Sequence, residues 1–97
     1  MFGTVGRGRI QEENREKLLD VMRKYEGVRI PGHRRTEVMF PENRPDEVLI
    51  AVWFEDANSY WKNAEDPAQH ERYLEYRALL EGDPEWSDGE WHPFEVG

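Results

Sequence analysis

Residues 48–54 read Val48-Leu49-Ile50-Ala51-Val52-Trp53-Phe54, an uninterrupted apolar run in a chain of 97 residues. The run is rich in β-branched and aromatic residues and is short for a buried helix, so it predicts a β-strand. Successive side chains of a strand point to opposite faces of the sheet, and here both sets are apolar. An antiparallel sheet with one face in water alternates apolar and polar residues instead. We therefore expect both faces of the sheet to be covered at this strand.

Other strands are predicted on both sides of this run. The expected strands are residues 2–10, 33–40, 47–54 and 91–96, and residues 83–90 are expected to form an acidic loop. The polar turn at residues 41–46 joins two of these strands as an antiparallel hairpin. The first strand is unusual because it contains three glycines. Pro93 restricts the last strand to an edge or terminal position of the sheet.

An amphipathic helix is predicted between the first two strands. Leu18, Met22 and Tyr25 recur at helical spacing after Gln11, and charged residues fill the other face. Gly27 is the expected end of this helix.

Helical signals also follow the central strand. Asp56 is expected to cap a short helix. Asp66 followed directly by Pro67 predicts the start of another helix, which runs to about Glu81 and ends at Gly82.

This order of elements predicts a single α+β domain over residues 1–97 with a ferredoxin-like β-α-β-β-α-β fold. Right-handed crossovers place the helices on one face of a four-stranded antiparallel sheet. The other face needs a different cover, and a second copy related by a two-fold axis supplies it. We therefore expect a homodimer. Its expected interface residues are Leu49, Ala51, Trp53, Val5 and Met39.

Composition and charge exclude several classes of protein. The formal net charge is -8, so nucleic acid and anionic membrane are not expected partners. The longest apolar run is far shorter than a membrane span, and the chain contains no cysteine, which fits the cytoplasm. Its histidines lie in distant segments without metal-ligand spacing, and no metal site is expected.

The chain resembles the antibiotic biosynthesis monooxygenase-like proteins of the dimeric α+β barrel superfamily. The resemblance rests on the first strand with Val5, Arg7 and Arg9, the Pro31-Gly32 pair, the Asp46–Trp53 stretch followed by Glu55, and the Asp66–His70 helix start. It implies two ferredoxin-like protomers whose sheets form a shared barrel, with a pocket between helices and sheet in each protomer. Members of the family include cofactor-free oxygenases, quinol oxygenases and heme-degrading enzymes.

Candidate site residues follow from residue type and from this resemblance. His70 and Tyr60 are expected as base or hydrogen-bond partner, since histidine titrates near neutral pH, and Asn58 as a donor to a developing oxyanion. Trp61 and Tyr73 are expected to form aromatic walls suited to a planar ligand. The remaining substrate-binding candidates share one face of the first strand and are Thr4, Gly6 and Gly8. These glycines indicate either the floor of a cavity or close packing of a helix on the sheet.

The preferred function is a small-molecule oxidoreductase, a cofactor-independent monooxygenase-like protein that acts on an aromatic or quinol-type substrate. Such chemistry needs no bound cofactor, because a deprotonated substrate itself reduces oxygen. The alternative is a non-catalytic small-molecule-binding or stress-associated homodimer. Heme degradation is a third hypothesis: Trp61 and His70 match two residues of that branch in type, but the first strand lacks its asparagine.

Overall fold

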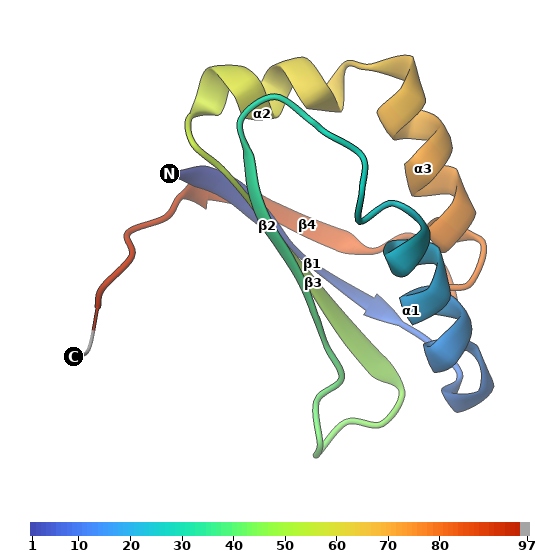
Figure 1. Cartoon of the computed structure of the whole chain (residues 1–97). Coiled ribbons are helices and arrows are strands. Elements are labelled where there is room, and N and C mark those ends of the chain that lie inside the picture. Colours follow the sequence, from blue (N-terminus) through green and yellow to red (C-terminus); the bar gives the residue numbers. More distant parts are fainter. Residues whose placement is uncertain (96–97) are drawn as a thin grey trace.

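The computed structural model describes residues 1–95 and has the predicted ferredoxin-like arrangement (Figure 1). The elements are β1 (Phe2–Arg9), the short helix η1 (Glu12–Asn14), α1 (Arg15–Lys24), β2 (His33–Met39), β3 (Glu47–Phe54), α2 (Ala57–Ala64), α3 (Pro67–Arg77) and β4 (Glu85–Glu90). Among the described residues, none of the helices combines the length and apolar character needed to cross a bilayer.

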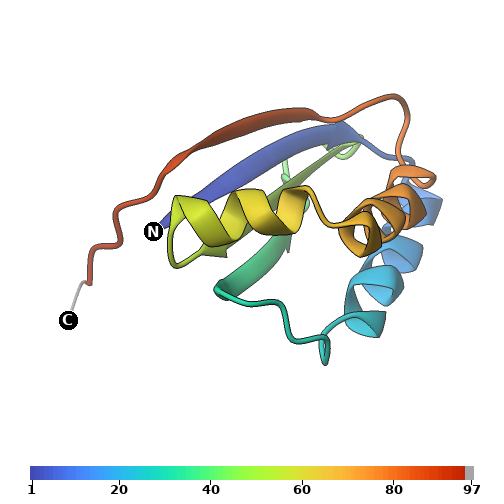
Figure 2. The same cartoon turned by 90° about the horizontal axis from the view of Figure 1, so that it is seen from above.

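The four strands form one antiparallel sheet in the order β2-β3-β1-β4. The two central strands, β1 and β3, are aligned so that Gly6 lies opposite Ile50 and Val5 opposite Ala51. All three α-helices lie on one side of this sheet (Figure 2). Within residues 1–95, no helix covers the other face of the sheet.

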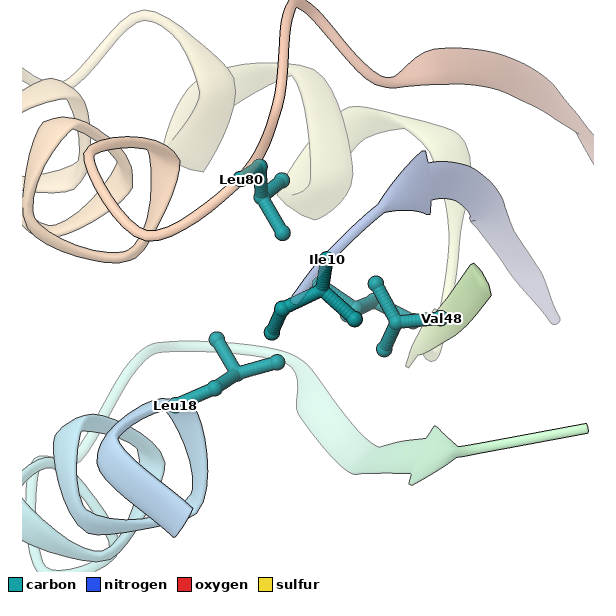
Figure 3. Close-up of a cluster of buried hydrophobic side chains, with 5 residues drawn as sticks. Ile10, Leu18, Val48 and Leu80 are labelled. Carbon is teal, nitrogen blue, oxygen red and sulfur yellow. The ribbon is translucent and has the colours of Figure 1, made fainter. Parts of the chain in front are cut away.

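The hydrophobic core lies between the helices and the sheet, at the end of β1. It contains Ile10, Leu18, Val48, Ile50 and Leu80, each buried (Figure 3). Val48 and Ile50 belong to the apolar run, and they point to the helix side because they alternate along β3. Leu18 comes from α1, which confirms the predicted apolar stripe of that helix.

Two predicted helix starts are confirmed by their caps. The Asp56 carboxylate accepts a hydrogen bond from the Ser59 backbone N–H at 2.8 Å, and this bond lowers the pKa of Asp56. The Asp66 carboxylate accepts a hydrogen bond from the Ala68 backbone N–H at 2.9 Å, and Pro67 occupies the first turn. These local signals act over three residues, which is why the sequence alone reveals them.

Two predicted helix ends are wrong. Helix α3 ends at Arg77 rather than near Glu81, because Leu80 leaves the helix to bridge Ile10 and enter the core. Gly82 has the expected positive φ of 85°. Gly27 does not have a positive φ, and the left-handed residue in this region is Gly32 with φ 80°.

The last strand was predicted in the wrong place. Residues 85–90, expected as an acidic loop, form β4, while Trp91 to Glu95 lie outside any strand and Val96 lies outside the described residues. Pairing with β1 stabilises this polar segment: Trp86 lies opposite Gly6 and Asp88 opposite Thr4. The ladder continues only to Trp91, whose N–H donates to the Met1 carbonyl at 2.8 Å.

The face without helices carries the residues that the sequence predicts at a dimer interface. Leu49, Ala51 and Trp53 alternate with the core residues of β3 and are half-buried within one protomer. Met39 at the end of β2 is 53% exposed. We call this apolar strip, formed by Val5, Met39, Leu49, Ala51 and Trp53, the open face.

Candidate functional site

A cleft of about 330 Å³ lies between α2, α3 and the sheet. We call it the tyrosine lobe, because Tyr60, Tyr73 and Tyr76 all line it. Helix α2 contributes the first of these and α3 the other two. The polar side chains of the lobe are completed by Thr4, Asn63, Gln69, His70 and Asp88.

Tyr60 is fixed by a hydrogen bond to β4. Its hydroxyl donates to the Asp88 Oδ1 at 2.6 Å, and its ring packs edge-on against Phe54 at 5.6 Å between centroids. Burial, followed by this bond, raises the pKa of Tyr60 to about 12. The phenol is therefore neutral at neutral pH with its proton directed to Asp88. Its oxygen can accept a hydrogen bond from a ligand, so the geometry favours the hydrogen-bond role over a phenolate base.

Tyr73 and Tyr76 form the aromatic wall on α3. Their rings are perpendicular with centroids 5.3 Å apart, and Tyr73 lies 6.3 Å from the Trp86 ring. Burial is the main cause that raises the pKa of Tyr76, and the neighbouring Tyr73 and Tyr60 raise it further. Within residues 1–95, neither Tyr73 nor Tyr76 makes a side-chain hydrogen bond through its hydroxyl. Both groups can therefore bond a polar ligand.

The sequence leaves open a cavity floor or close packing of a helix for the glycines of β1. The structure shows close packing, but by Trp86 of β4 and by Leu80 beyond the end of α3 rather than by a helix. A Cβ atom on Gly6 would lie 2.5 Å from the Trp86 ring, and one on Gly8 would lie 3.3 Å from Leu80. Neither glycine lines the tyrosine lobe. Gly6 instead lets the Trp86 ring lie against the sheet, where it forms part of the lobe wall.

Thr4 does reach the lobe. It is 4% exposed, and its hydroxyl donates to the Ser87 carbonyl at 3.1 Å, which ties β1 to β4. The neighbouring Thr4 hydroxyl partly offsets the rise in the pKa of Tyr60.

The other predicted site residues divide into two groups. His70 is exposed and lines the tyrosine lobe near Tyr73, with ring centroids 6.5 Å apart. Asn58 is exposed and does not line the lobe. Trp61 is 46% exposed, packs against Phe2 and Tyr60, and likewise does not line it.

Sequence reasoning missed Asp88, Trp86 and Asn63 as lining residues. The sequence predicts a loop at Asp88 and Trp86, and only the pairing of β4 with β1 brings these two residues to the helix side. Trp86 and Asp88 lie two residues apart, which is the spacing of side chains on one face of a strand. This pattern is too short to outweigh the acidic composition of residues 83–90, which favours a loop. Asn63 lies at the C-terminal end of α2, on the side that faces the lobe.

No three His, Asp or Glu side chains of the described part of the chain gather as a metal site. The candidate site therefore consists of phenol, imidazole, amide and carboxylate groups around an aromatic wall.

Comparison with known proteins identifies relatives of the fold and the sequence. The family model of the antibiotic biosynthesis monooxygenases matches residues 1–81. SnoaB, a cofactor-independent oxygenase from Streptomyces nogalater, is similar in structure with a TM-score of 0.74 at 14% identity, over 96% of this chain and 94% of that one. A conserved protein from Methanosarcina mazei Go1 is similar with a TM-score of 0.76 at 12% identity, over 91% and 89%. No curated protein sequence matches the chain.

Proposed function

The chain belongs to the antibiotic biosynthesis monooxygenase family, and we propose on that premise that it is a cofactor-independent, monooxygenase-like oxidoreductase. Its substrate is an aromatic or quinol-type molecule bound in the tyrosine lobe. The observation that carries the proposal is the lobe itself, a cleft of about 330 Å³ that combines aromatic walls with a few polar groups. The sheet forms its floor and the helices its walls.

The chemistry requires a base and an enclosed substrate. Loss of a proton from an anthrone- or quinol-type substrate produces an electron-rich anion that transfers an electron to oxygen. The resulting substrate radical and superoxide combine to a peroxide anion, and the base returns its proton to this anion. Loss of water from the hydroperoxide then leaves the oxidised product and the base in its starting state. The protein accelerates the first step by accepting the proton in the transition state.

The side chains of the lobe supply a route for this proton. A substrate hydroxyl that donates to the Tyr60 oxygen would pass its proton to Tyr60 as the Tyr60 proton moves 2.6 Å to Asp88. Asp88 is then the final acceptor and Tyr60 the relay. His70 at the edge of the lobe is the second candidate base, since histidine is the side chain used most often for general acid–base catalysis. Asn58 and Trp61 lie outside the lobe and have no role in this scheme.

We further propose that the protein is a cytoplasmic homodimer in which two open faces meet. The support is the half-buried apolar strip on β3, together with Met39 at its edge. Apolar side chains left on one face of a sheet mark protein–protein contact in many proteins. Here the charged residues Arg7, Arg35 and Glu37 lie opposite members of the strip.

Oxygen uptake with a panel of anthrones and hydroquinones tests the enzymatic proposal. Removal of the acceptor in Asp88→Asn, or of the relay in Tyr60→Phe, is expected to lower kcat/KM on the order of 100-fold. His70→Ala tests the second base. His92→Ala is the matched control, because His92 is exposed and pairs with Glu90 away from the lobe.

Three outcomes decide between the hypotheses. Uptake that falls in the Asp88 and Tyr60 variants supports the relay. Binding of the panel without any oxygen uptake would favour the non-catalytic binding protein. A Soret shift on addition of hemin, lost in His70→Ala, would favour the heme hypothesis.

A further inference from the structure

A second hollow of about 290 Å³ adjoins the tyrosine lobe. It lies between β2, β3 and the segment that connects α1 to β2, on the helix side of the sheet. We call it the valine lobe, because its apolar lining is mostly aliphatic. That lining includes Met22, Val28, Ile30, Val38 and Ile50.

The two lobes adjoin each other. Both are lined by Val52 and Phe54 on the sheet, by Asn63 on α2, and by Gln69 and Tyr76 on α3. Tyr76 is partly buried and packs against the core where the lobes meet. A molecule that occupies both lobes therefore contacts these shared residues.

The chemistry of the two lobes differs. The tyrosine lobe holds three phenol groups together with His70 and Asp88. The valine lobe carries its aliphatic side chains on α1, on the connecting segment and on both strands, while β2 also contributes the polar His33 and Thr36. Its charged groups, Glu26 and Arg72, come from the helical and loop side. A ligand that fits both lobes therefore has an aromatic ring at one end and an aliphatic chain at the other.

The wall of the valine lobe is held in place by contacts between α1 and α3. The Tyr25 hydroxyl donates to the Glu75 carboxylate, and Lys24 Nζ lies 2.7 Å from the Glu75 Oε1. Arg72 donates to the Gln69 Oε1 at 3.2 Å beside the junction. The two bonds to Glu75 link the end of α1 to α3 beside the hollow, and the Arg72–Gln69 bond lies within α3.

We propose that the substrate is a phenol or quinol with an apolar substituent, whose ring occupies the tyrosine lobe and whose substituent occupies the valine lobe. This inference rests on the proposed function for the position of the ring. It adds a substrate class, amphipathic phenols with a hydrocarbon chain, and a specificity site formed by Val28, Ile30 and Val38.

Calorimetric binding of 4-alkylphenols from 4-ethylphenol to 4-hexylphenol tests the inference without turnover. The Kd of the wild type is expected to fall by about fourfold for each added methylene, or about 250-fold over the four methylenes of the series. Val38→Phe fills the valine lobe from its floor and should abolish this gain while leaving the Kd of 4-ethylphenol unchanged. Val38 does not line the tyrosine lobe.

A second variant distinguishes a filled valine lobe from a folding defect caused by Val38→Phe. Val28 is 42% exposed at the mouth of the lobe, so Val28→Trp narrows it without disturbing the core. Leu74→Trp is the matched control, because Leu74 is 49% exposed on α3 and lines neither lobe. It should retain the full chain-length gain.

A flat series in the wild type, or a gain that survives in both lobe variants, would overturn the inference. The result is also separable from the proposed function. Binding that tightens with chain length but comes without oxygen uptake would support the valine lobe as a binding site and contradict the monooxygenase activity. Oxygen uptake on short-chain quinols, together with a Kd that stays the same along the alkylphenol series, would support the activity and contradict the valine lobe as a substrate site.

Discussion

Both faces of strand β3 are apolar, but only one of them is covered by helices within the described part of the protomer. On the helix side, Val48 is 0% exposed and Ile50 is 2% exposed, and Leu18 and Leu80 pack over them. On the open face, Leu49 and Trp53 remain half-buried, although they are equally apolar. The difference shows that hydrophobicity alone does not decide which residues form the core. The crossovers decide it, because both place their helices on the same side.

The two faces also differ in the hollows they carry. The open side has a hollow of about 370 Å³ lined by Trp53, Trp91, Arg34 and Arg35 among others. Its arginines already form ion pairs, Arg34 with Glu55 at 3.5 Å and Arg35 with Glu37. The tyrosine lobe is of similar size, but Tyr73 and Tyr76 have no such partners among the described residues. We therefore place ligand chemistry on the helix side and subunit contact on the open side.

The largest expected effect comes from a charge placed in the core. Ile50→Asp should prevent folding, because an unpaired carboxylate in the core costs several kcal/mol, about the whole stability of a small domain. Leu49→Asp, one residue away, should retain native circular dichroism, because its side chain lies on the open face. Equal loss of structure in both variants would contradict the distinction between the faces.

The next prediction concerns the assembly. If the proposed dimer forms through the open face, Leu49→Asp should convert it to a monomer, since the substitution places two like charges in one symmetric interface. Sedimentation velocity at micromolar concentration measures this change. Leu74→Asp is the control, because Leu74 is exposed on α3 rather than on the open face. A wild type that sediments as a monomer would remove the interface proposal.

A smaller effect is expected from two glycines of the sheet. Gly6→Ala should lower the free energy of unfolding by ~1–3 kcal/mol, because the new methyl group would overlap the Trp86 ring. Gly89→Ala should be neutral or stabilising, because nothing lies within 4 Å of its new methyl group. Urea denaturation of both variants measures the difference. Equal effects would mean that Trp86 does not rest on Gly6.

The smallest expected effect is alkaline destabilisation through Tyr60. Its pKa is raised from 10.0 to about 12 in the folded chain, so the contribution to stability is complete below pH 10 and is lost between pH 10 and 12. Tyr60→Phe removes this contribution, and its stability should decline less steeply than that of the wild type over this range. Tyr25 also has a raised pKa and affects both proteins alike, and burial, the main cause of the raised pKa of Tyr76, is common to both proteins. If the stabilities of the wild type and of Tyr60→Phe decline equally between pH 10 and 12, the assignment of the raised pKa to Tyr60 is contradicted.

The sequence was sufficient for the parts of the fold that depend on local signals. The apolar run, the Asp56 and Asp66 caps and the stripe of α1 each act over a few residues, and all are confirmed. Strand β4 was missed because its only large apolar side chain is Trp86, and pairing with β1 rather than composition makes it a strand.

The same distinction applies to the candidate site. Tyr60, Tyr73, His70 and Thr4 reach the cleft as the sequence analysis expected, because helical and strand periodicity places them toward it. Asp88 and Asn63 depend on the register of β4 and on the rotation of α2, which are set by tertiary contacts. Gly6 was ambiguous for a similar reason: only the Trp86 ring above it distinguishes packing from an empty cavity.

The position of the ligand is tested most directly by the indole N–H resonances of the protein during a titration with 4-ethylphenol. Single Trp→Phe variants assign the signals. We predict that the Trp86 signal shifts in a saturable way, while those of Trp53 and Trp91 stay in place, because only Trp86 lines the tyrosine lobe. Saturable shifts of Trp53 and Trp91 with an unchanged Trp86 signal would place the ligand on the open side and contradict the account.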